Sequence, residues 1–153
     1  MKKNLLFFLF LYSILPSSGF AQETKQYSML FKLIVHDGNN KGTLLNITKN
    51  GKQISNSETD GKWNIQLLDF NTHYLFTCTK EGYITKAIEI DTTVPEERMN
   101  KRFNKFKCEV NLFPQPKDRI LNYYRPVGRL IYNDSYDDFN YDEKYMQSVG
   151  AAY

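Results

Sequence analysis

Two cysteines and two histidines are the residues of this 153-residue sequence best suited to catalysis or metal binding. Cys78 and Cys108 lie on the apolar side of predicted strands, whereas His36 and His73 lie at strand ends beside turn residues. A metal or hydrolytic site would need such side chains to converge with carboxylates, and no H-x-x-x-H or C-x-x-C spacing is present. We therefore predict no metal site, no cofactor and no catalytic residues, and we interpret the histidines as surface residues.

A cluster of carboxylates near the C-terminus is the other candidate for chemistry. Its members are Asp134, Asp137, Asp138, Asp142 and Glu143. A calcium loop would place oxygen ligands at alternating positions around a glycine, and this segment has no such glycine. Hydrolysis of a glycan would need carboxylates on two walls of a cleft, whereas these belong to one loop. The cluster therefore does not predict an enzyme.

The first 21 residues have the order of a secretory signal peptide. Lys2 and Lys3 precede an apolar run over residues 5–15, and Gly19-Phe20-Ala21 supplies small residues before a cleavage point. A membrane-spanning helix would need about 20 apolar residues, so this run is too short. We predict export to the periplasm or cell surface, with no transmembrane segment in residues 22–153. Removing both lysines lowers the net charge of +3 to near neutral, which gives no reason to expect nucleic-acid binding.

Period-two alternation of apolar residues indicates strands over most of residues 22–113. Turn signals separate them, including Asn50-Gly51, whose residue types favour a tight hairpin turn. In the fourth strand we expect Trp63, Ile65 and Leu67 to face the core. The strands fall at residues 27–35, 45–47, 53–55, 63–67, 74–79, 84–90 and 105–112.

Cys78 and Cys108 both lie on the apolar faces of their predicted strands, and two structural explanations of this placement remain open. Export would place them in an oxidising compartment, where a disulfide between two strands would persist. Such a bond would close a loop of about 30 residues and add about 3 kcal/mol of stability. Alternatively, both are buried free thiols that pack as small hydrophobic groups.

Residues 114–153 form a tyrosine-rich C-terminal extension. An eighth strand is predicted at residues 127–132, an acidic turn region at 133–140 and a short helix at 142–152. Tyrosine is favoured at interfaces, so the extension could dock a partner. We favour the alternative that it folds back onto the strands, because Leu130 and Ile131 require burial. The tyrosines that would contact a partner are Tyr123, Tyr124, Tyr132, Tyr136 and Tyr141.

Several short motifs resemble the carboxypeptidase-regulatory-like, transthyretin-like β-sandwich domains. They are Lys49-Asn50-Gly51-Lys52, Thr59-Asp60-Gly61-Lys62-Trp63-Asn64-Ile65, His73-Tyr74-Leu75-Phe76, Lys80-Glu81-Gly82-Tyr83 and Lys86-Ala87-Ile88-Glu89-Ile90. The resemblance and the strand pattern imply an all-β fold: a seven- to eight-stranded antiparallel sandwich of the immunoglobulin or prealbumin type at residues 22–113. Residues 114–153 would pack on it.

The function that this resemblance implies is a non-catalytic binding or structural accessory module of the Gram-negative cell envelope. Its partner would be an envelope protein or a glycan. One alternative is a carbohydrate-binding module, for which Tyr83, Tyr123 and Tyr124 are the plausible aromatic contacts. A second is a small secreted hydrolase that uses Cys78, His73 or the acidic cluster.

Overall fold

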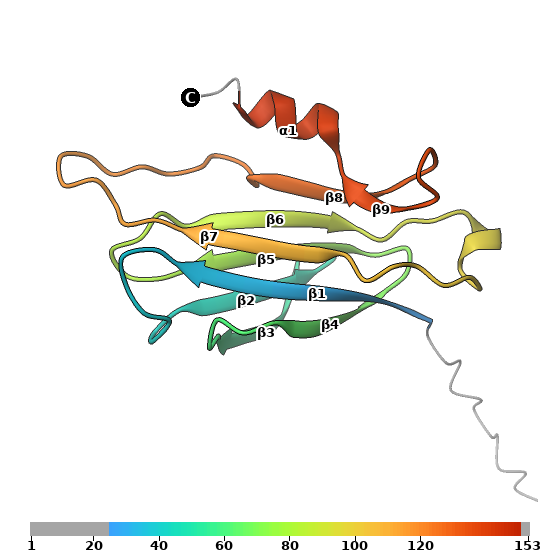
Figure 1. The fold of residues 1–153 in the computed structure, drawn as a ribbon, viewed down its shortest axis with the longest axis horizontal. Coiled ribbons are helices and arrows are strands. Elements are labelled where there is room, and N and C mark those ends of the chain that lie inside the picture. The colour runs from blue at the N-terminus through green and yellow to red at the C-terminus, as the bar shows by residue number, and fades with distance from the viewer. Residues whose placement is uncertain (1–24, 151–153) are drawn as a thin grey trace, which may run out of the picture.

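The computed structural model describes residues 25–150, which form nine strands, a short 3₁₀ turn and one α-helix (Figure 1). The signal peptide predicted at residues 1–21 lies outside this range. In chain order the elements are β1 (Gln26–Val35), β2 (Leu44–Lys49), β3 (Lys52–Glu58), β4 (Asn64–Asp69), β5 (His73–Thr79), β6 (Lys86–Asp91), the 3₁₀ turn (Glu96–Arg98), β7 (Lys107–Leu112), β8 (Gly128–Asn133), β9 (Asp138–Tyr141) and α1 (Glu143–Gly150). The predicted all-β class is confirmed, and so is the short helix near the C-terminus.

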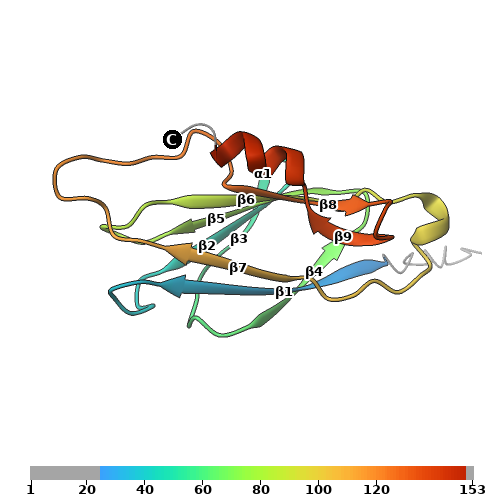
Figure 2. The same ribbon diagram turned by 45° about the horizontal axis from the view of Figure 1, so that its top comes forward.

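The strands form two mixed sheets. One has the order β4-β1-β7 and the other β3-β2-β5-β6-β8-β9, and Figure 2 shows them as two layers with α1 beside β8. Most neighbours are antiparallel, but β1 pairs with β7 and β6 pairs with β8 in parallel. The prediction of purely antiparallel sheets is therefore wrong at these two pairings. A parallel neighbour requires a crossover between the sheets rather than a hairpin, and residue alternation does not reveal it.

A single hydrophobic core joins the inner faces of the two sheets. Its members come from both layers, and the rings of Phe31 on β1 and Phe76 on β5 lie 5.4 Å apart. Every second residue of β1, from Tyr27 to Leu33, is buried as predicted. Burying one large apolar side chain contributes about 1.5–3 kcal/mol, so this stripe is a principal source of stability.

Strand β4 presents the opposite face from the one predicted. Trp63, Ile65 and Leu67 are exposed to 41%, 56% and 61%, whereas Leu68 is buried. The register explains this difference, because Leu68 lies opposite the buried Tyr27. Directly opposed residues of an antiparallel pair share a face, so the intervening side chains point outward. The prediction that Trp63, Ile65 and Leu67 line the core is wrong.

The C-terminal strands complete the larger sheet. Leu130 on β8 is fully buried, and the ring of Phe139 on β9 stacks on Tyr27 at 4.1 Å between centroids. Strand β9 begins at Asp138, inside residues 133–140, so the prediction that this whole segment is a turn is wrong. Asp142 is the N-cap of α1. Its carboxylate accepts a hydrogen bond from the Tyr145 backbone N–H at 3.1 Å, which satisfies a free donor of the first helical turn.

An ion pair ties the end of β2 to the end of β4. The Lys49 ammonium and the Gln26 side-chain amide both hydrogen-bond to the Asp69 carboxylate. These two bonds, with the Lys49 bond the larger cause, hold the pKa of Asp69 below its ordinary value. The carboxylate therefore stabilises the fold above about pH 4, the pKa of an unfolded aspartate, and this contribution disappears as pH falls through the lower folded pKa.

We expect Asp69→Asn to lower the urea midpoint of unfolding at pH 7, because it removes the charge that Lys49 binds. The difference from the parent protein should shrink steadily as the pH is lowered from about 4 through the depressed folded pKa of Asp69, because the parent carboxylate is protonated there. Urea titrations at several pH values measure this difference. A midpoint difference that stayed constant over that range would contradict the assignment.

Candidate functional site

The two cysteines lie in opposite sheets and are fully buried. Cys78 belongs to β5 and Cys108 to β7, and both thiols are free in the structure. Burial raises the pKa of Cys108 to about 11, although a contact of 3.7 Å with the Tyr141 hydroxyl opposes this effect. Burial, and then the neighbouring Cys108, raise the pKa of Cys78 as well. A thiol protonated at neutral pH is a weak nucleophile, so these side chains are suited to packing.

Thiol labelling distinguishes a Cys78–Cys108 disulfide from a pair of buried free thiols. If both are free, 5,5′-dithiobis(2-nitrobenzoate) should label them slowly in the folded protein and label two thiols per chain after unfolding without reductant. Replacing Cys108 with alanine should halve the final yield. A protein purified from the oxidising compartment that released no thiol on unfolding would instead carry a Cys78–Cys108 disulfide.

The histidines are far from forming a shared site. His36 stacks on Phe113 at 4.4 Å and hydrogen-bonds through Nε2 to the Asn111 side chain at 2.7 Å. His73 lies half exposed on β5, with ring nitrogens 3.5 Å from Glu89 and 3.4 Å from Asp91. Within residues 25–150, no group of three or more His, Cys, Asp or Glu side chains is placed to hold a metal.

The acidic residues of the extension connect it to the rest of the fold. The Asp137 carboxylate lies 2.6 Å from Arg98 and accepts a hydrogen bond from the Tyr132 hydroxyl at 2.6 Å. The Asp138 carboxylate accepts a bond from the backbone N–H of Asn104 at 3.3 Å. The Asp137 and Asp138 carboxylates therefore have structural partners.

The five tyrosines predicted to contact a partner occupy different places. Tyr141 is half-buried beside Cys108, and the Tyr132 hydroxyl donates a hydrogen bond to Asp137. Tyr136 is exposed in the turn between β8 and β9. Only Tyr123 and Tyr124 lie together, in the long connection between β7 and β8 that Figure 1 shows extending beyond the sheets. Tyr83, the third aromatic residue expected in a carbohydrate site, donates a hydrogen bond to the Asp37 carbonyl at 3.3 Å.

A pocket of about 570 Å³ lies between this connection and the end of α1. Sequence analysis did not identify it, because its walls come from three separate segments. The nearest signal was the apolar content of residues 120–124 within an otherwise polar loop. The residues that line the pocket are Ile84, Arg119, Leu121, Asn122, Tyr123, Tyr124, Arg125 and Val149.

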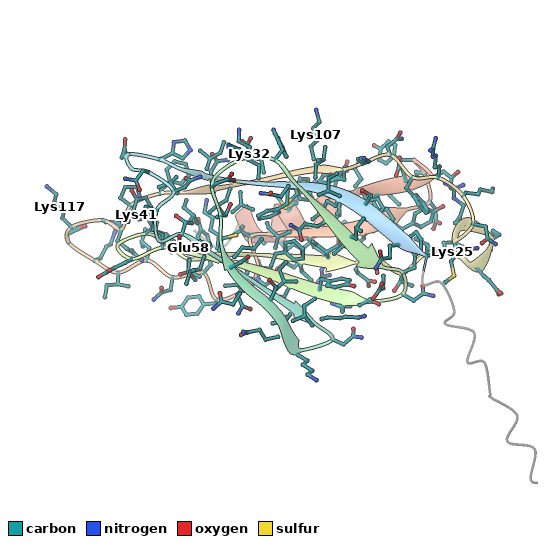
Figure 3. The ribbon with its side chains drawn as sticks, turned by 90° about the horizontal axis from the view of Figure 1, so that it is seen from below. Lys25, Lys32, Lys41, Glu58, Lys107 and Lys117 are labelled. Atoms are coloured by element: carbon teal, nitrogen blue, oxygen red, sulfur yellow. The ribbon has the colours of Figure 1, made fainter. Side chains whose placement is uncertain are left out.

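The outer face of the β4-β1-β7 sheet is the second surface of interest. It displays Ile65 and Leu67 on β4, at an edge of the sheet, and Trp63 immediately before that strand. The Lys32 ammonium lies 5.6 Å from the centre of the Trp63 ring. Figure 3 shows Lys32 and Lys107 pointing away from the molecule on the same side. Lys32 also lies 3.9 Å from the Glu109 carboxylate, so this face combines apolar side chains with charged ones of both signs.

Comparisons with known proteins do not define a family. No family model matches the sequence, and no curated protein matches it. The structure is similar to one described as "Crystal Structure of S.CueP", with a TM-score of 0.38 and 14% identity. The match covers 60% of this chain and 64% of that one, so it spans less than two thirds of the neighbour. None of the helices within residues 25–150 has the length and hydrophobicity that a bilayer span requires.

Proposed function

We propose that this protein is an exported, non-catalytic binding or structural accessory module of the bacterial cell envelope, built on a transthyretin-like β-sandwich. The signal sequence at residues 1–21 supports export. The two-sheet arrangement and the turn motifs support the sandwich. The burial of both thiols and the structural pairing of the acidic residues favour binding over catalysis.

The observation that carries this proposal is the exposed apolar edge of the smaller sheet. Ile65 and Leu67 lie on successive outward positions of β4, Trp63 immediately precedes the strand, and the other edge of β4 is bonded to β1. Contiguous apolar side chains are rarely exposed on a soluble protein without an interaction that covers them. Strand edges also offer unpaired backbone donors and acceptors to a partner strand. The partner favoured by this combination is another envelope protein.

Site-specific photo-crosslinking tests the proposal in the native envelope. A benzoylphenylalanine at Leu67 should capture a product of discrete size, whereas the same probe at Lys144, exposed on α1, should not. Ile65→Lys should reduce the Leu67 product about tenfold, since a charge would have to be desolvated in the interface. Because Ile65 is exposed, the variant should keep its circular-dichroism spectrum. Equal capture from both positions, or no effect of Ile65→Lys, would reject the proposal.

The second candidate is a carbohydrate-binding module. The observation that favours it is the full exposure of Tyr124 beside Tyr123, since exposed aromatic rings stack on sugar rings. A glycan array should then show binding that Tyr124→Ala removes and Tyr136→Ala leaves intact. An array without signal would count against this function.

A further inference from the structure

The pocket beside α1 has apolar walls. Ile84 and Val149 are buried side chains that form part of its lining, and Leu121 contributes from the loop. Its volume of about 570 Å³ lies within the range of about 300–1,000 Å³ that is typical of small-molecule sites. The pocket is therefore large enough for a ligand with a substantial apolar part.

Specific bonds hold the loop in the shape that creates this pocket. The Gln115 side chain accepts a hydrogen bond from the Leu121 backbone N–H and donates one to its carbonyl, each at 2.9 Å. Arg125 donates to the Ser148 carbonyl near the end of α1, and its guanidinium lies 5.7 Å from the Tyr145 ring. The pocket thus exists before any ligand binds, which lowers the entropic cost of binding.

The charge of the lining is entirely positive. Arg119 and Arg125 are its ionisable side chains besides the tyrosines, and none of the described residues lining it is an aspartate or glutamate. Arg125 already donates to a carbonyl, whereas Arg119 has no acidic partner within residues 25–150. A guanidinium presents a fork of donors that matches a carboxylate or phosphate.

We propose that this pocket binds a small anionic amphiphile, a molecule with an apolar chain or ring and one carboxylate. The apolar part would lie against Ile84, Leu121 and Val149, and the carboxylate would pair with Arg119. This site is separate from the β4 face, so the two proposals stand or fall independently.

Paired NMR titrations test the inference with octanoate and 1-octanol, which share a chain length but differ in charge. Both should cause saturable shifts of the backbone amides of Ile84, Leu121 and Val149. Octanoate should bind about five- to tenfold more tightly than 1-octanol, the effect of a partly exposed charged hydrogen bond. Shifts spread over the surface without saturation would overturn the proposal.

Two variants assign the roles of the charge and of the walls. Arg119→Gln should remove the preference for octanoate and leave 1-octanol binding unchanged, while Leu121→Ser should weaken both. Lys117→Gln is the matched control, since it removes an exposed cation two residues away that does not line the pocket. Arg119 is exposed, so its variant should fold normally. An octanoate preference that survives Arg119→Gln, or one that Lys117→Gln also removes, would reject the assignment.

Discussion

Phe76→Ala should lower the free energy of unfolding by about 3–5 kcal/mol, the usual cost of removing a buried phenylalanine. Phe76 is fully buried at the centre of β5, and its ring meets Phe31 of the opposite sheet edge-on. The substitution removes apolar contacts from both layers and leaves a cavity that neighbouring strands fill only in part. Because typical domains are stable by only about 5–15 kcal/mol, a large part of the total stability would be lost.

Urea denaturation followed by circular dichroism measures this loss. Ile54→Ala is the control, because Ile54 is 55% exposed on β3 and its truncation should change stability by no more than about 0.5 kcal/mol. If Phe76→Ala were as mild as the control, the two sheets would not share the core described above.

A chain of residues 22–126 should not unfold cooperatively, although it contains all seven strands expected in the sandwich. Ending there removes Leu130 and Phe139 from the core and leaves β6 with an unpaired edge. Phe139 stacks directly on Tyr27, so the smaller sheet also loses a contact. Loss of several buried side chains at about 2–5 kcal/mol each exceeds the stability of an ordinary domain.

The matched control ends at residue 142 and removes α1 while keeping β8 and β9. We expect this chain to retain a single cooperative thermal transition at a lower midpoint, since α1 contacts mainly β8. Calorimetry of both truncated chains makes the comparison. A sharp transition for residues 22–126 would show that the extension is dispensable for folding.

The positions of the strands followed from the sequence because local patterns specify them. Alternation located β1, β5 and β7, and the Asn50-Gly51 turn between β2 and β3 has the positive φ angles of 48° and 78° that its residue types favour. Alternation does not say which face is buried when both carry apolar residues. In β4, Leu67 and Leu68 are adjacent, and only the long-range pairing of Leu68 with Tyr27 decides between them.

The candidate binding surfaces depended on arrangements that no local pattern contains. The exposed edge of β4 results from its register against β1, and the pocket brings Ile84, Leu121 and Val149 together from distant segments. The tyrosines of the extension were identified as a set, but the fold separates them: Tyr141 is half-buried beside Cys108, whereas Tyr124 is fully exposed. The tyrosine content of residues 114–153 suggested that some of these side chains contact a partner, but it did not show which of them lie close together in the fold.

The parallel pairing of the first strand with the seventh has a consequence for how quickly the native state is reached. The Phe106 backbone N–H donates a hydrogen bond to the Tyr27 hydroxyl, and these two residues are 79 positions apart in the sequence. Contacts between such distant segments give the topology a high contact order, and proteins of this kind fold in about milliseconds to seconds rather than microseconds. During that interval the edge of β1 that later pairs with β7 stays unpaired, and unpaired strand edges favour aggregation.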